Sequence, residues 1–134
     1  MTRDDLIAVL ERAAAGWRDG DASAVGDAFA IDVEYSDPYL YRFSRREDLL
    51  PFFEPPPGGH HVTWHQVLWD DVTQRGAVEY TYEGDHRYHG AAIVALDGGG
   101  RIELWREWQH LDDAMTWEER LAGPDPDEPI ASVT

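Results

Sequence analysis

The chain contains no cysteine and no long hydrophobic run. Without cysteine, disulfide bonds, thiolate catalysis and thiolate metal ligands are all excluded. No apolar segment approaches the roughly 18–20 residues that cross a bilayer, so the sequence offers no membrane-spanning helix. The first five residues are mostly charged and show no signal peptide. We therefore expect a cytoplasmic soluble protein.

Basic residues are also scarce, with 11 of them against 27 acidic residues and a formal net charge of −16. Binding to nucleic acid needs lysine and arginine to replace the counterions around phosphates. The composition therefore argues against nucleic acid as a partner. The same scarcity of basic residues argues against binding to an anionic membrane surface. The charge removes these partners without identifying another.

The composition fits one folded domain. Hydrophobic residues make up 43% of the 134 residues, enough for a hydrophobic core. We expect a single domain over residues 1–121 and an acidic, flexible C-terminal tail over residues 122–134, where proline and aspartate alternate. The six Trp, six Tyr and four Phe suit a concave apolar pocket, although a core built from large side chains would use them equally well.

Apolar residues recur at helical spacing in the first part of the chain. Leu6, Leu10 and Trp17 predict an amphipathic helix over 3–18, with a capping box formed by Thr2 and Asp5. A short second helix follows Gly20, and a third opens at a second capping box over 44–47. Because proline interrupts this third helix at position 51, we expect it to be short or kinked.

Period-two alternation then predicts strands. The expected strands are 32–37, 61–69, 75–83, 87–97 and 101–110, followed by a short helix over 112–121. Helices first and a long antiparallel meander second indicate an α+β domain. We expect a curved antiparallel sheet wrapped around the N-terminal helices, enclosing a cone-shaped pocket.

The first strand ends in a carboxylate. Val33, Tyr35 and Asp37 share one face of this strand, and Pro38 should end it because proline has no N–H and keeps the preceding residue extended. Two interpretations remain open for Asp37. It is either an inward-facing carboxylate with a chemical purpose or a turn carboxylate at the start of a loop.

The order of these pieces resembles the nuclear transport factor 2-like superfamily, and within it the SnoaL-like polyketide cyclases and their relatives. The resemblance spans roughly residues 4–112. It is carried by Trp17-Arg18-Asp19-Gly20-Asp21, Tyr35-Ser36-Asp37-Pro38, Ser44-Arg45-Arg46-Glu47 with Phe52-Phe53, and Gly100-Arg101-Ile102-Glu103-Leu104-Trp105-Arg106-Glu107-Trp108. The superfamily hosts isomerases, cyclases, hydrolases and plain binding proteins, so the resemblance implies a fold more strongly than a reaction.

Two groups of relatives allow a comparison of residues. In ketosteroid isomerase the Asp before Pro at the end of the first strand is the general base, and Asp37 matches it. The tyrosine and protonated aspartate that accompany this base match Ala13 and Ala92 here. In limonene epoxide hydrolase the closing motif carries a catalytic aspartate, which Glu107 matches. The remaining Arg-x-Asp pair of that enzyme falls near residues 80–82, which are Tyr-Thr-Tyr.

The resulting candidate catalytic residues are Asp37, Glu107 and Tyr35. The candidate substrate-binding residues are Trp17, His65, Tyr80, Tyr82, Trp105 and Gln109. Two carboxylates in a mostly aromatic cavity resist simultaneous ionisation, so one of them would keep its proton, as acid–base catalysis requires. Other interpretations remain open: Glu107 as half of an ion pair or exposed at a sheet edge, and Tyr35 as a core residue.

His61 and His65 share one face of a strand, but no third metal ligand stands out in the sequence, so we expect no metal site and no cofactor. We expect acid–base catalysis of an isomerisation, cyclisation or hydration on a small to medium apolar molecule. The alternative is a non-catalytic binding module of the same fold. By resemblance we also expect a homodimer that forms through the outer sheet face, where Arg106 and Trp108 would point.

Overall fold

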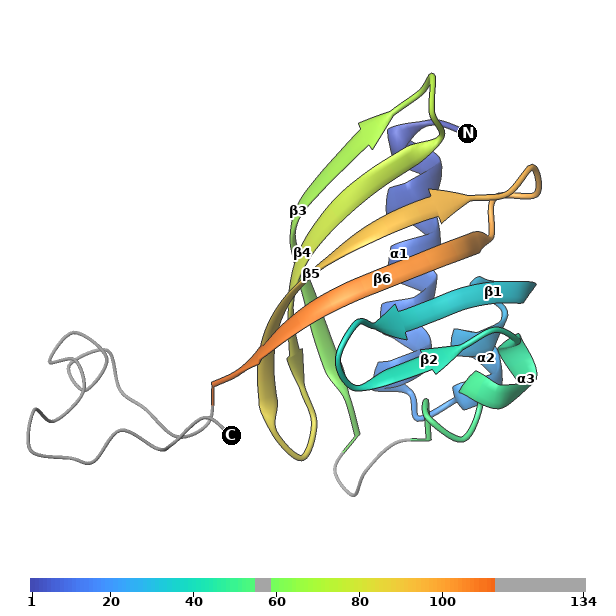
Figure 1. Ribbon diagram of the computed structural model, residues 1–134. Helices are drawn as coiled ribbons and strands as arrows, with labels where there is room; N and C mark the ends of the chain where they lie inside the picture. Colours follow the sequence, from blue (N-terminus) through green and yellow to red (C-terminus); the bar gives the residue numbers. More distant parts are fainter. Residues whose placement is uncertain (55–58, 113–134) are drawn as a thin grey trace, which may run out of the picture.

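The computed structural model describes residues 1–54 and 59–112. One long helix lies across the concave face of a curved, unclosed six-stranded sheet, and two short helices lie near one end of it (Figure 1). The helices are α1 (Arg3–Arg18), α2 (Ala22–Gly26) and α3 (Arg46–Leu49). The strands are β1 (Phe29–Asp37), β2 (Tyr41–Phe43), β3 (His61–Asp70), β4 (Arg75–Glu83), β5 (Arg87–Leu96) and β6 (Ile102–Leu111).

The first helix forms as predicted. Thr2 accepts a hydrogen bond from the backbone N–H of Asp5, and the Asp5 side chain accepts one from the Thr2 backbone, which completes the capping box. The apolar stripe that includes Leu6, Leu10 and Trp17 is buried against the sheet. The short second helix is confirmed too, with Asp21 accepting from the backbone N–H of the third residue along.

The capping box predicted for α3 is wrong. The helix begins after Arg45 and has no side-chain capping hydrogen bond. Glu47, which would have to reach back to Ser44, instead lies 2.9 Å from the guanidinium of Arg45. The helix is a single turn that ends just before Pro51, in agreement with the prediction of a short segment.

The strand order is β2-β1-β6-β5-β4-β3. Strands β3 to β6 form the predicted antiparallel meander. Two features differ from the sequence prediction. The three-residue strand β2 was missed, and it folds back on β1 as an antiparallel neighbour. The pairing of β1 with β6 is parallel, whereas the other neighbouring strands pair in the antiparallel direction.

The hydrophobic core lies between α1, the short helices and the inner face of the sheet. Phe29 packs against Tyr35 at 5.7 Å and against Phe53 at 5.3 Å between ring centroids, and Trp105 joins this group. No helix in the described part of the chain is long and apolar enough to cross a membrane. The helix predicted over 112–121, the domain boundary at 121 and the tail over 122–134 lie outside the described residues.

Candidate active site

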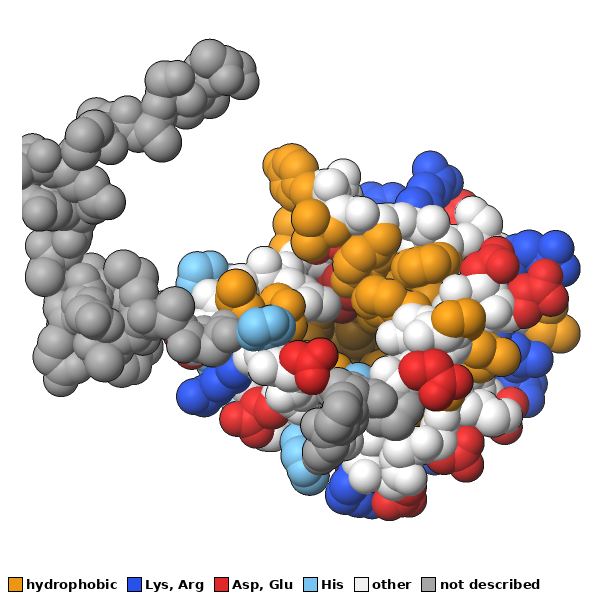
Figure 2. Space-filling model, turned by 90° about the horizontal axis from the view of Figure 1, so that it is seen from below, with side chains coloured by type: hydrophobic (Ala, Val, Ile, Leu, Met, Phe, Trp, Pro, Cys, Tyr) orange, Lys and Arg blue, Asp and Glu red, His pale blue; other side chains and the backbone are white. Residues whose placement is uncertain are grey.

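A cavity of about 420 Å³ opens between α1, the inner face of the sheet and the segment around β2 and α3. From below, it is a hollow surrounded largely by hydrophobic side chains (Figure 2). Ten of its 18 lining residues are Trp, Tyr or Phe. They include Trp17, Tyr35, Tyr80, Tyr82 and Trp105, all predicted from the sequence, and the cavity also reaches Glu107 and Gln109.

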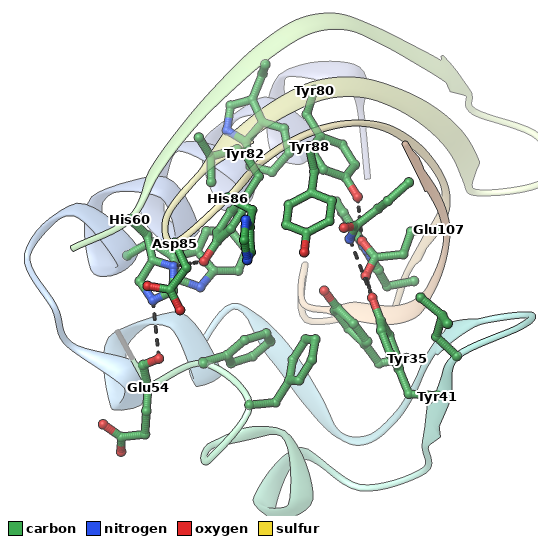
Figure 3. A pocket seen from close by; sticks show the side chains of 18 residues that line it. Tyr35, Tyr41, Glu54, His60, Tyr80, Tyr82, Asp85, His86, Tyr88 and Glu107 are labelled. Carbon is green, nitrogen blue, oxygen red and sulfur yellow. Dashed lines mark hydrogen bonds between the residues drawn. The ribbon is translucent and has the colours of Figure 1, made fainter. Parts of the chain in front are cut away.

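Glu107 lies at one end of this cavity and is 1% exposed. Its Oε2 accepts hydrogen bonds from the hydroxyl of Tyr80 at 2.5 Å and from the indole N–H of Trp105 at 2.8 Å. Its Oε1 accepts a hydrogen bond from the hydroxyl of Tyr41 (Figure 3). Three donors thus converge on a carboxylate that makes no ion pair within residues 1–54 and 59–112, and the donor set matches the ionised form, which only accepts.

The strands explain this convergence. Alternation along β6 turns Trp105, Glu107 and Gln109 to the inner face, as predicted. Tyr80 comes from β4 and Tyr41 from β2, so the three hydroxyl and carboxyl groups arrive from three strands. The amide of Gln109 donates to the Tyr41 oxygen at 3.4 Å and extends the network.

The phenols around Glu107 stay neutral. Burial first, and then the negative charge of Glu107, raise the pKa of Tyr80 and of Tyr41 above the ordinary range of a phenol. The same two causes raise the pKa of Tyr35, whose ring stacks on Trp105 with centroids 6.1 Å apart. At neutral pH these groups therefore act as hydrogen-bond donors that orient the carboxylate.

Asp37 does not line this cavity. Its side chain, 7% exposed, accepts a hydrogen bond at 2.8 Å from the backbone N–H of Tyr39, two residues on. This is the turn carboxylate that the sequence left as an alternative. Asp37 instead lines a second depression with Arg42 and Arg106. The expectation that Asp37 and Glu107 share one cavity is corrected, because the turn after β1 draws the Asp37 side chain to the hairpin backbone.

His65 also lies outside the cavity. The pairing of β3 with β4 shifts between Trp64 and Gln66, so His65 is the extra residue of a β-bulge. It is exposed, and its Nε2 lies 2.6 Å from the hydroxyl of Thr81, which belongs to the opposite face of β4 from Tyr80. The prediction of His65 as a pocket residue is wrong because Val62 and Trp64 line the cavity, so alternation along β3 places His65 on the outer face.

A second polar group lies at the other end of the cavity, and sequence reasoning missed most of it. His60 is 4% exposed, and its Nε2 lies 3.3 Å from the carbonyl oxygen of Glu54. A carbonyl only accepts, so Nε2 carries the hydrogen and Nδ1 accepts from the hydroxyl of Tyr82. Burial lowers the pKa of His60 and keeps the ring neutral. Asp85 and His86 lie beside this pair (Figure 3).

The missed residues had weak signals. Tyr41 belongs to a strand of only three residues, too short for alternation to identify. His60 precedes β3 and follows the proline-rich loop, where no periodicity applies. The turn residues 38–40 were the one local hint that a second strand returns beside β1.

The two positions compared with ketosteroid isomerase are both buried. Ala92 lies directly opposite Glu107 in the pairing of β5 with β6, and Ala13 faces the core from α1. Neither carries a donor. The donors come instead from Tyr80 and Tyr41. Within residues 1–54 and 59–112, no group of three or more His, Cys, Asp or Glu is placed to hold a metal ion.

No family model and no curated protein matches the chain. Solved structures do match it. An NTF-2 like protein of unknown function from Burkholderia xenovorans LB400 is 12% identical with a TM-score of 0.67, covering 91% of this chain and 95% of that one. A putative ketosteroid isomerase from Kribbella flavida DSM 17836 is 20% identical with a TM-score of 0.66, covering 93% of both chains. An LEH-like epoxide hydrolase from M. tuberculosis is 19% identical with a TM-score of 0.66, covering 80% of this chain and 84% of that one.

The chain has the nuclear transport factor 2-like fold. The α+β class and the curved sheet expected from the sequence are confirmed. At sequence identities this low, the likeness to these structures shows the fold and does not indicate a particular reaction.

Proposed function

We propose that the protein is an acid–base enzyme acting on a small to medium, largely apolar molecule, with Glu107 as the group that takes up and returns a proton. The observation that carries this proposal is the burial of Glu107 in an aromatic cavity without an arginine or lysine among the described residues that line it. A carboxylate held in one place against an apolar ligand is positioned to take up a proton from it, as general base catalysis requires.

The hydrogen bonds around Glu107 support the same role. Two carboxylate oxygens offer about four acceptor positions. Tyr80 and Trp105 donate to Oε2, Tyr41 donates to Oε1, and Tyr35 also forms a side-chain hydrogen bond with the carboxylate. These donors, together with Tyr35, fix the position and the orientation of the carboxylate inside the cavity.

The class of reaction is isomerisation, cyclisation or hydration, each of which begins by moving a proton between substrate and protein. A putative ketosteroid isomerase and an LEH-like epoxide hydrolase share the fold, which supports this class without choosing within it. In this proposal Asp37 holds the hairpin that carries Tyr41 and acts as a positioning residue, and the substrate contacts the aromatic walls through Trp17, Tyr82 and their neighbours.

A non-catalytic binding module is the second candidate. The observation that favours it is the saturation of Glu107 by three donors, since a buried carboxylate with this many hydrogen bonds is also a stable structural element. The two candidates share one cavity and differ only in turnover.

The deciding experiment uses cyclic ketones and epoxides, with and without an amine substituent. Deuterium uptake next to the carbonyl in D₂O is followed by proton NMR, and diol formation by chromatography. We expect Glu107→Gln to lower the rate at least about a hundredfold, the scale of general acid–base catalysis. Glu103→Gln, the same change on the exposed face of β6, is the matched control.

Equal rates in the wild type and Glu107→Gln contradict the enzyme proposal. Binding of panel members to the wild type, seen as shifts in its NMR spectrum, without any Glu107-dependent turnover supports the binding module instead.

We also propose that the protein is a cytoplasmic homodimer. The outer sheet face exposes Trp108 by 43% and Ile93 by 40%, with Arg106 beside them, and such a face suits contact with a second copy. Light scattering after size exclusion measures the mass, and a monomer at micromolar concentration contradicts the proposal.

A further inference from the structure

We infer that the ligand of this cavity carries a positive charge: an alkylated or quaternary amine on an otherwise apolar body. The inference names a class of ligand for the cavity of the proposed function. It rests on the proposed function only for the location of the site. It changes the expected ligand from a neutral apolar molecule to a cationic one.

Charge is the first observation. The lining residues include three carboxylates, Glu54, Asp85 and Glu107, and no arginine. The whole sequence contains no lysine. Glu107 is 1% exposed, and none of its hydrogen-bond donors carries a charge. A buried ionised carboxylate is costly unless an opposite charge compensates it, and here a cationic ligand supplies that charge.

The aromatic wall is the second observation. Ten Trp, Tyr and Phe side chains surround the cavity, among them Trp17, Trp64 and Trp105. The face of an aromatic ring carries negative potential and attracts a cation, most strongly in tryptophan, when the charge lies within about 6 Å of the ring centre. Cages of aromatic rings recognise quaternary ammonium ligands through this attraction.

The direction of the phenol hydrogens is the third observation. Tyr80 and Tyr41 both donate their hydrogens to Glu107. At the opposite end of the cavity, Tyr82 donates its hydrogen to His60. These three hydroxyl groups therefore offer the ligand oxygen lone pairs. An arrangement of acceptors and negative charges suits a protonated or alkylated amine and opposes a carboxylate or phosphate.

The neutral state of His60 also favours a cationic ligand. The charged and titratable groups that face it are Glu54, Tyr82, Asp85 and His86. Burial lowers the pKa of His60, so at pH 7 and above the ring adds no positive charge that would compete with a cationic ligand.

The test compares two molecules of the same shape. The first is 4-(trimethylammonio)benzyl alcohol, and the second is 4-tert-butylbenzyl alcohol, in which carbon replaces the charged nitrogen. Affinities are measured by quenching of tryptophan fluorescence at pH 7.5 and 0.15 M salt, where the Debye length of about 8 Å suppresses attraction to the general charge of −16. We expect the cation to bind at least tenfold tighter, about 1.4 kcal/mol.

Variants locate the effect. Glu107→Gln should lower the ratio of the two affinities from at least tenfold to near one, whereas Glu103→Gln should leave this ratio unchanged. Equal or tighter binding of the uncharged alcohol overturns the inference, and so does a preference that survives Glu107→Gln.

This outcome is separable from that of the proposed function. Glu107-dependent turnover of neutral ketones without a preference for the cation contradicts only the inference. A preference for the cation without turnover contradicts only the enzyme proposal.

Discussion

Tyr80 reaches Glu107 across an intervening strand, with its hydroxyl 2.5 Å from Oε2. The two residues lie on β4 and β6, and β5 runs between them. The Tyr80 ring passes directly over Gly90 of β5. A Cβ atom at position 90 would lie 2.5 Å from Cζ of Tyr80, closer than two carbons can approach. Because Gly90 has no side chain, it leaves the space that the Tyr80 ring needs to reach Glu107.

This relationship predicts that Gly90→Ala and Tyr80→Phe act on one interaction. Tyr80→Phe should lower the free energy of unfolding by about 1–3 kcal/mol, because a buried carboxylate loses one of its donors. Gly90→Ala should displace the ring and cause a loss of the same kind. The double variant should cost clearly less than the sum of the two, as coupled residues do. Urea unfolding measures all three.

Tyr88→Phe is the matched control for this cycle, because Tyr88 lines the same cavity and gives no hydrogen bond to Glu107. Additive losses in the double variant would show that Gly90 and Tyr80 act separately.

The turn at Asp37 gives a prediction that separates its two interpretations. Asp37→Asn keeps an oxygen that accepts from the backbone N–H of Tyr39, so stability and turnover should stay close to those of the wild type. Asp37→Ala removes the acceptor and should cost about 0.5–1.5 kcal/mol of unfolding free energy, with lower turnover because Tyr41 loses its support. Urea unfolding and the exchange assay measure the two effects.

If Asp37 is instead the general base, Asp37→Asn abolishes turnover as completely as Asp37→Ala while leaving the fold intact. That result would return Asp37 to the catalytic role expected from the resemblance.

The tyrosines predict how stability depends on pH. Burial raises the pKa of Tyr35, Tyr41 and Tyr80 in the folded chain, and burial followed by the charge of Asp85 raises the pKa of Tyr82 to about 12. The unfolded chain releases these protons near pH 10, so their contribution to stability is complete below pH 10 and is lost as the pH rises above it.

Absorbance at 295 nm measures the ionised phenols directly. At pH 11 the folded protein should show roughly four fewer phenolates than the same protein in urea, while circular dichroism reports an intact fold. Titration of every tyrosine near pH 10 with the fold retained would contradict the burial of these hydroxyl groups.

Local patterns predicted much of the fold. The stripe of Leu6, Leu10 and Trp17 predicted α1, and period-two alternation predicted the four meander strands to within one residue at each end. Both patterns depend only on neighbouring residues, so the sequence contains them in full. The predictions failed where a competing contact, or the choice of which strand face turns inward, decides the outcome. Glu47 pairs with Arg45 in place of capping α3, and β3 turns Val62 and Trp64 to the cavity, which leaves His65 on the outer face.

The sequence by itself determined that Trp105, Glu107 and Gln109 share a face of β6, since alternation is a property of the extended backbone. Only the tertiary structure decided which groups meet that face. Tyr80 is 27 residues from Glu107 and Tyr41 is 66 residues away, and both reach it because the strand order β2-β1-β6-β5-β4-β3 curves around one cavity. Spacing along the chain carries no record of that curvature.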